Sequence, residues 1–361
     1  MIGRTIFWYF LRRYLVIVAQ FLIGVVVIAF LIDFAEMARR ASNLEGYTFA
    51  RGIMMTLLKL PSLIEQTMPF VILFAAMSTL MTLNRKYELV VARSAGVSAW
   101  QFLSPLLVGS LMIGMFSVTV LNYVSATALA KSEAMEAQLF RGGAPSNTQQ
   151  VTWLRQRTDE GVTIIGAKRT AQQGLLLSDA TFIRFNQDGD ISERLDAREA
   201  MLGSGAWELK DVTRLDSDGN REKIAATSVA TGLQPEFVQE RFADPQSIPL
   251  YELGAKIDAA RAFGLSANGF RMQYHSLLAL PPLLVAMTLI AATVSMRFAR
   301  LGQSAVMILG GVLAGFLLYV VTALVKTLGS GGLMPPIVAA WIPVILASLY
   351  GVTFLLYKED G

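Results

Sequence analysis

The chain has no cysteine and one histidine, His275, in 361 residues. Without cysteine there can be no disulfide, thiolate metal site or cysteine nucleophile, and one histidine cannot supply a site built from several imidazoles. The GxxxxGK[ST] phosphate loop and the HExxH and GxSxG motifs are also missing. We therefore expect no cofactor, no metal and no catalytic residue in this chain.

Charge is scarce as well. Charged residues make up 16% of the chain, whereas soluble domains have about 25%. Residues 124–268 carry 16 Lys/Arg and 20 Asp/Glu, a net charge of −4, while the rest of the chain nets +8. One polar domain is thus inserted into an apolar membrane protein, and nucleic acid is not an expected partner.

Six apolar runs are long enough to cross a bilayer. They lie near 15–34, 61–83, 101–123, 272–295, 304–326 and 336–357. The first follows Arg4, Arg12 and Arg13 and has no small-x-small cleavage site, which predicts an uncleaved signal anchor. Glycines 310, 311 and 315 in the fifth run either permit close helix approach or are ordinary glycines of a membrane helix.

Basic residues in the short connections predict the orientation, because such residues accumulate on the cytoplasmic side. With six spans, one side of the membrane receives the N-terminal arginines, the segment that follows the second span, the connection between the fourth and fifth spans, and Lys358. Both termini are therefore expected in the cytoplasm. The inserted domain is expected outside the inner membrane, in the periplasm.

The inserted domain has the pattern of an all-β fold. Residues 151–155, 162–165, 180–185 and 206–212 alternate polar and apolar side chains, and Gly-containing turns lie at 188–190 and 218–220. We expect a sandwich or half-open roll, followed by a helix over 249–263. Asp188, Asp190, Asp216 and Asp218 lack EF-hand spacing, which favours a role in turns over calcium binding.

The segment 84–101 between the second and third spans is charged and compatible with a helix. Glu88 lies within a few residues of Arg85, Lys86 and Arg93. A short polar turn would connect two spans with fewer residues, so we interpret the segment as a coupling helix that receives a soluble partner. The alternative is an amphipathic helix on lipid headgroups, although an acidic residue is unfavourable near anionic lipid.

Together these features resemble the lipopolysaccharide export permeases of the LptF/LptG (YjgP/YjgQ) family, over essentially the whole chain. The resemblance is most specific from Thr67-Met-Pro-Phe through residues 84–98, NRKYELVVARSAGVS. Residues 32–36, IDFAE, and 206–212, AWELKDV, are similar to the family's first span and periplasmic strand motif. Within the family, ELVV followed by SAG favours the LptG branch over the LptF branch.

The resemblance implies six transmembrane helices with a periplasmic jellyroll-like domain between the third and fourth. The implied division is 1–123 for helices 1–3 with the coupling helix at 84–101, 124–268 for the β-jellyroll domain, and 269–361 for helices 4–6. It also implies an ABC-type exporter with the paralogue LptF, two copies of the ATPase LptB, LptC and the bridge protein LptA. The cargo would be lipopolysaccharide, and ATP would be hydrolysed by the partner.

The resemblance also indicates residues that would contact cargo. Basic residues near the periplasmic interface either anchor helix ends or bind the phosphates and core sugars of lipopolysaccharide. They are Arg39, Arg40, Lys326, Arg51, Lys59 and Arg271. Relatives often carry a basic residue where this chain has Asp33, which weakens a phosphate contact at that turn. His275 is interpreted as an interface residue or a pH sensor.

Apolar side chains of the β domain are expected to line its interior, where they form either a packed core or a path for acyl chains. They are Trp153, Ile164, Phe182, Phe185 and Trp207. Two other functions remain open. One is a non-transporting assembly factor whose periplasmic domain binds a partner protein, and the other, with no catalytic motif to support it, is an enzyme acting on lipid.

Overall fold

In the computed structural model, the described residues are 4–42, 47–139, 152–158, 161–171, 175–186, 190–203, 205–216, 220–231, 244–262, 266–297 and 304–359. The helical part contains six segments that are long and apolar enough to cross a membrane, as the sequence predicts. In chain order these are α1 (Arg4–Ala41), α2 (Phe49–Arg85), α4 with α5 (Ala99–Phe116 and Asn122–Leu139, joined by the π-helix Ser117–Leu121), α8 (Asn268–Arg297), α9 (Ser304–Ser330) and α10 (Pro336–Glu359).

Several helices are longer than the apolar runs that predicted them. At 1.5 Å per residue a helix of 38 residues is about 57 Å long, against a hydrocarbon core of about 30 Å, and α1 has 38 residues. The third span likewise continues through α5 to Leu139. Both helices therefore extend beyond the bilayer.

Helix boundaries follow local sequence signals. Thr48 accepts a hydrogen bond from the Arg51 N–H at the start of α2. Ser98 and Gln101 form a reciprocal capping box at the start of α4, which satisfies two backbone groups that the helix itself leaves free. The prolines within the spans stay inside continuous helices, as at Pro61 and Pro69 in α2.

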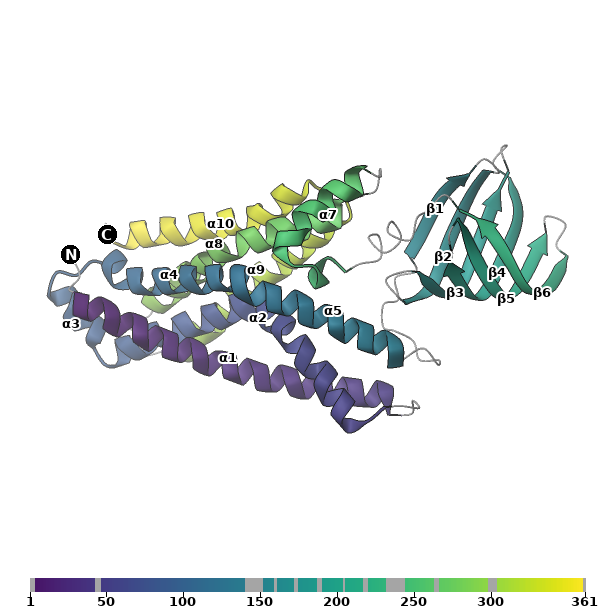
Figure 1. The fold of residues 1–361 in the computed structure, drawn as a ribbon. Helices are drawn as coiled ribbons and strands as arrows, with labels where there is room; N and C mark the ends of the chain where they lie inside the picture. Colours follow the sequence, from purple (N-terminus) through teal and green to yellow (C-terminus); the bar gives the residue numbers. More distant parts are fainter. Residues whose placement is uncertain are drawn as a thin grey trace.

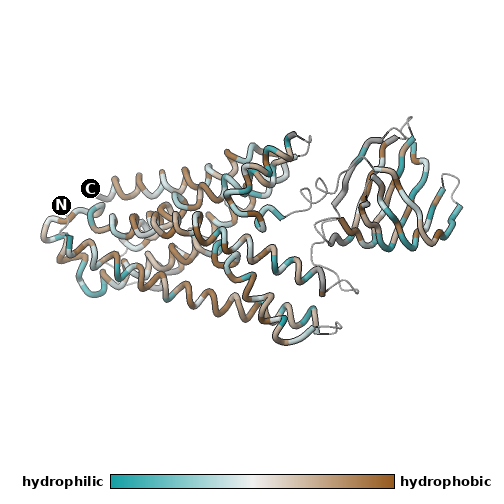
Figure 2. Tube along the Cα trace, in the orientation of Figure 1, coloured by the Kyte–Doolittle hydropathy of each residue, from teal (hydrophilic) through white to brown (hydrophobic). Residues whose placement is uncertain are grey.

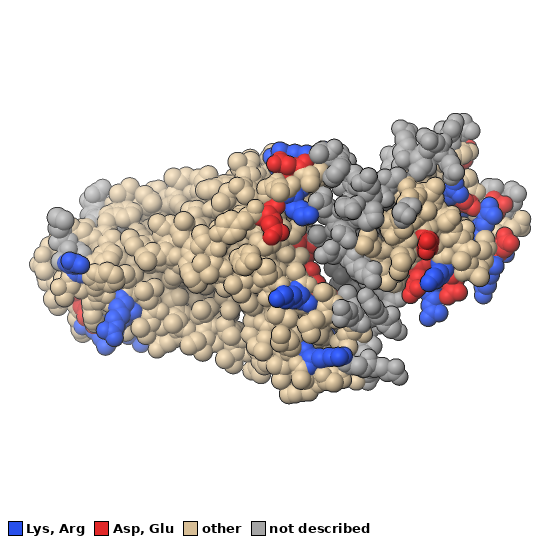
Figure 3. Space-filling view, in the orientation of Figure 1, with Lys and Arg blue, Asp and Glu red and all other residues tan. Residues whose placement is uncertain are grey.

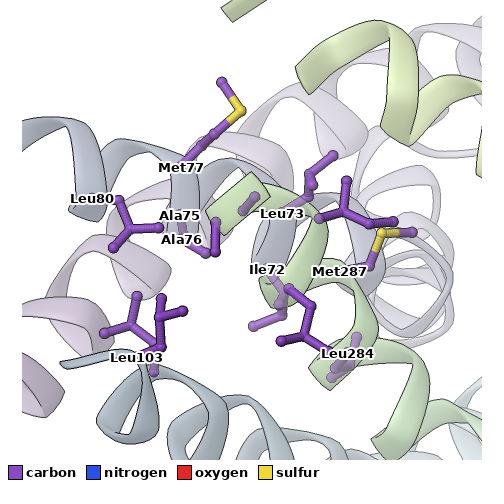
Figure 4. Close-up of a cluster of buried hydrophobic side chains, with 14 of the residues drawn as sticks. Ile72, Leu73, Ala75, Ala76, Met77, Leu80, Leu103, Leu284 and Met287 are labelled. Carbon is purple, nitrogen blue, oxygen red and sulfur yellow. The ribbon is translucent and has the colours of Figure 1, made fainter. Parts of the chain in front are cut away.

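Helices α2, α4 and α8 form the centre of the bundle. Figure 4 shows Leu80 of α2 facing Leu103 of α4, and Ile72 of α2 beside Leu284 of α8. These side chains belong to one buried apolar cluster. By contrast, only 6% of the apolar window of α1 and 11% of that of α9 is buried inside the chain. These two helices leave most of their apolar surface to lipid or to another protein.

The inserted domain is a single six-stranded antiparallel sheet in the order β1-β2-β3-β4-β5-β6. Its strands are β1 (Thr152–Thr158), β2 (Gly161–Ala171), β3 (Leu176–Phe185), β4 (Ile191–Leu202), β5 (Ala206–Asp216) and β6 (Arg221–Ala230). The alternating segments predicted four of these strands and missed β4 and β6. One face carries an apolar core around Phe182 and Trp207, whose rings meet edge to face at 6.0 Å.

The sheet curls so that its two edges approach each other. Gln156 of β1 donates a hydrogen bond from Nε2 to the Ala230 carbonyl at the end of β6 (3.1 Å) and accepts one from the Thr231 hydroxyl (2.5 Å). The Gln156 side chain is buried. This bridge between edge strands gives the half-open roll that was one of the two expected forms.

Figure 1 shows how these parts are arranged. The short helix α3 (Glu88–Ser94) and both ends of the described chain lie at one end of the bundle, called here the α3 end, and the β domain lies beyond the other end. The 3-10 turn Pro245–Ser247 and α7 (Leu250–Ala262) lead from the β domain back to α8. The helices are apolar along most of their length (Figure 2), and charged side chains gather towards the ends of the bundle and on the β domain (Figure 3).

Candidate functional site

The segment between the second and third spans forms a sharp corner and a helix of one to two turns. Helix α2 ends at Arg85, Tyr87 has φ 59° in the left-handed region, and α3 begins at Glu88. A non-glycine residue in this region is strained, and such residues gather at functional sites. Within the expected range 84–101, the α3 helix covers seven residues, and α4 begins at Ala99.

Glu88 is held by the first helix rather than extending into solvent. Its Oε1 accepts a hydrogen bond from Arg13 Nη1 at 2.9 Å, and the Tyr9 hydroxyl lies 3.4 Å from the same oxygen. Arg13 Nη1 also donates to the Tyr9 hydroxyl at 3.0 Å. The Arg13 and Glu88 side chains are 17% and 26% exposed, so the pair is partly shielded from water and salt.

The solvent-facing side of α3 and its corner is basic and apolar. Arg85, Lys86 and Arg93 are exposed, as are the side chains of Tyr87, Val90 and Val91. Leu89 faces inward and is buried. On this surface three cations surround an apolar centre, while the carboxylate of Glu88 faces α1.

A hollow of ≈ 90 Å³ lies behind α3 and is lined by Leu80, Asn84, Leu89, Val90, Arg93, Phe102 and Ser295. The Arg93 guanidinium lies 5.9 Å from the centre of the Phe102 ring, within the range of a cation–π contact. The Ser295 hydroxyl is buried without a hydrogen-bond partner. The α3 helix thus rests on an incompletely filled site.

At the β-domain end, most of the predicted cargo-binding residues have partners within the chain. Arg39 and Arg40 both pair with Glu36 in the last turns of α1, at 2.8 Å and 2.6 Å. Arg39 keeps 74% of its side chain exposed, while Arg40 keeps 28%. Lys59 of α2 pairs with Glu136 of α5 at 2.9 Å. These contacts leave Arg39 the most accessible of the three cations.

Lys326 of α9 points into the bundle. Its Nζ lies 3.4 Å from Gln273 Oε1 on α8, and Glu65 of α2 is close enough to interact electrostatically. Arg51 is exposed near the start of α2, and Arg271 is half-buried in the first turn of α8. His275 packs its ring edge to face on Tyr274 at 5.4 Å.

A polar network between the spans was missed from sequence. Asn122, the first residue of α5, donates from Nδ2 to Glu65 Oε1 (3.2 Å), and its Oδ1 accepts the Leu250 N–H at the start of α7 (2.9 Å). The Tyr251 hydroxyl donates to the Thr119 carbonyl in the π-helix. A carboxylate in an apolar span is by itself a signal of function or pairing, so Glu65 could have been singled out.

The register of the sheet divides the predicted interior residues between its two faces. Ile165 pairs with Phe182, whereas Ile164 pairs with Ile183 and Val162 with Phe185. Successive residues of a strand point to opposite faces, so Ile164 and Phe185 lie on the face away from the core. Phe182 and Trp207 are in the core. The side chain of Trp153 lies outside the described residues.

Among the described residues, no group of three His, Asp or Glu side chains is arranged to hold a metal ion. What the geometry does define is a multi-pass membrane protein with a corner helix at one end of its bundle and a β roll beyond the other.

Sequence comparison identifies the family. The family model "Lipopolysaccharide export system permease LptF/LptG" matches residues 8–358, and the chain belongs to this family. It is similar to the lipopolysaccharide export system permease protein LptG of Escherichia coli K12, with 21% identity over 99% of this chain and 97% of the relative. The protein of that name from Haemophilus influenzae is 23% identical over 88% of each chain.

Proposed function

We propose that the chain is a permease subunit of an ABC-type exporter that extracts lipopolysaccharide from the inner membrane and passes it to a periplasmic bridge. The observation that carries the proposal is the placement of α3 at one end of the bundle and of the β roll at the other (Figure 1). A soluble motor could act on the first while an amphiphile leaves through the second. The family match supports lipopolysaccharide as the cargo.

In this proposal the α3 end is cytoplasmic and docks the ATPase LptB. The chain has no P-loop of its own, so the energy of ATP must come from a partner. Arg85, Lys86 and Arg93 supply exposed contacts, and Glu88 joins the docked helix to the bundle. A heterodimer with LptF would complete the permease, with LptC and LptA receiving the cargo on the periplasmic side.

Cargo binding belongs to the opposite end. Arg39 is exposed enough to meet a phosphate beside its ion pair with Glu36. Arg40, Lys59 and Lys326 are less accessible and would have to exchange their internal partners for cargo, with Arg51 and Arg271 adding charge. Exposure of an acyl chain to water costs about 0.8 kcal/mol per CH₂, so an apolar path from the bundle to the roll would avoid this cost during an ATP-driven transfer. Closure of the ATPase would move α3 and, through it, the second and third spans that it joins.

The test is reconstitution with the P-loop partner and lipopolysaccharide in proteoliposomes. We expect ATP-dependent release of lipopolysaccharide to a periplasmic acceptor, and no release with a non-hydrolysable ATP analogue. Release that does not depend on ATP, or binding of a protein partner without release of lipid, would favour the assembly-factor alternative.

The docking site is tested by replacing Glu88. Glu88→Ala should weaken copurification of the ATPase about tenfold, because α3 would no longer be held in place. Ser94→Ala, an exposed change on the same helix, is the matched control. Equal recovery of the ATPase with both variants, together with unchanged growth, would remove Glu88 from the site.

The cargo site is tested by photocrosslinking from single positions. A crosslinker at Arg39, Arg40 or Lys326 should form an adduct with lipopolysaccharide. One at Leu317 of α9, an exposed apolar position, is the control and should form none. If none of the three basic positions forms a lipopolysaccharide adduct, cargo does not pass this end of the bundle.

A further inference from the structure

The α3 helix depends on very few contacts for its position. With seven residues it is too short to be stable alone, and Leu89 is its one buried side chain. A hollow of ≈ 90 Å³ borders the helix at Leu89, Val90 and Arg93. Side chains outside the segment therefore matter for its position. Phe102 of α4 lies against Arg93, and one further side chain makes a polar contact.

Arg13 of α1 is that side chain. It lies 75 residues away in sequence from Glu88 and reaches it with Nη1 at 2.9 Å, while Tyr9 bonds to both partners. The guanidinium of Arg13 also lies 6.0 Å from the centre of the Tyr9 ring. Three groups from two segments are thus joined around one carboxylate oxygen. A charge-assisted hydrogen bond that is partly shielded from solvent is stronger than an exposed ion pair.

The pair joins α3 to the end of α1 that is anchored in the bundle. The buried residues of α1 near this end are Phe10, Leu11, Tyr14 and Val18, and the next buried residue along the helix is Met37. A displacement of α3 would therefore act on the packed end of α1. Farther along, α1 contacts α2 again, where Phe21 stacks on Phe74 and Met37 packs with Met55.

We infer that Arg13 is a positioning residue for the coupling segment, which clamps α3 against α1 through Glu88 so that the two residues act as one unit. The inference rests on the proposed function for its role in transport. The clamp itself concerns only this chain. It adds α1 to the elements that move when α3 is displaced, beside α2 and α4, which are covalently joined to it.

The clamp is tested by hydrogen exchange of the α3 amides in the full-length protein in nanodiscs. Arg13→Ala and Glu88→Ala should each raise exchange across 88–95 by about threefold to tenfold, and the double variant should exchange no faster than the single ones. Arg13→Lys should restore much of the protection. Arg12→Ala, which removes the exposed neighbouring arginine, is the control and should match the wild type.

The same variants are then assayed with the copurified ATPase for ATP-driven release of lipopolysaccharide. Arg13→Ala should lower release about tenfold in the wild-type background and have no further effect with Glu88→Ala, which an independent structural role of Arg13 would not produce. Additive losses, or Arg13→Ala indistinguishable from Arg12→Ala, would overturn the inference. If wild-type protein neither binds an ATPase nor releases lipid, the proposed function fails, and the exchange experiment still decides the clamp.

Discussion

At the scale of single residues, close helix packing depends on a few glycines whose importance the sequence could not rank. A Cβ added at Gly114 of α4 would lie 2.5 Å from the backbone Cα of Pro281 on α8, whereas one added at Gly310 of α9 would meet nothing within 4 Å. At Gly311 and Gly315 a Cβ would overlap the side chains of Met77 and Leu73 on α2. Two pairs of helices, α4 with α8 and α9 with α2, therefore approach each other closely at glycines.

Gly114→Ala should destabilise the protein, because backbone atoms at Pro281 cannot rotate away as a side chain can. Overpacking of this kind costs about 1–3 kcal/mol, which should lower the midpoint of thermal unfolding in detergent. Gly310→Ala is the matched control, since it adds the same methyl group to open space and gains up to about 1 kcal/mol of helix propensity. Equal midpoints for the two variants would contradict the packing.

At the scale of elements, the π-helix in the third span is the point where three segments meet. A π-helix is rare and is frequently found at functional sites. Asn122, the residue directly after the π-helix, bonds to Glu65 of α2 and to the Leu250 N–H at the start of α7. The Tyr251 hydroxyl of α7 donates a hydrogen bond to the Thr119 carbonyl within the π-helix. The helix that leaves the β domain is thereby tied to the spans that flank α3.

Asn122→Ala should release α7. The change removes partners from both the Glu65 carboxylate and the Leu250 N–H, and a buried polar group left without a partner costs about 1–3 kcal/mol. We expect faster hydrogen exchange across 250–257 by about fivefold or more. Thr119→Val is the control, because the Thr119 hydroxyl bonds only to the Met115 carbonyl in its own helix. Unchanged exchange in α7 would show that Asn122 does not hold it.

At the scale of the whole molecule, the β roll must open if acyl chains are to touch its core. Its described edges are β1 and β6, and the Gln156 side chain is the bridge between them. Separation of β1 from β6 would expose the apolar core around Trp207 and keep the backbone hydrogen bonds between neighbouring strands. The Trp207 Nε1 is buried without a hydrogen-bond partner. On opening, this N–H could donate a hydrogen bond to solvent or to cargo.

Gln156→Ala should weaken the contact between the edges β1 and β6. Hydrogen exchange of β1 amides should rise severalfold, while β3 and β4, each paired on both sides, should keep their protection. Ser192→Ala on the exposed surface of β4 is the control. If β1 exchange stays at the wild-type rate, the two edges are held together by something other than Gln156.

The sequence alone was enough for the six spans and the inserted β domain, because these depend on the length of apolar runs and on alternation within a strand. The family followed from the resemblance of particular residues, above all those at 67–70 and 84–98. It also located the charged segment after the second span. It could not show that Glu88 faces Arg13, that Lys326 turns towards Gln273 and Glu65, or that Ile165 rather than Ile164 meets Phe182. Those outcomes depend on helix rotation and strand register, which are decided by packing between segments far apart in the chain, and so only the tertiary structure could fix them.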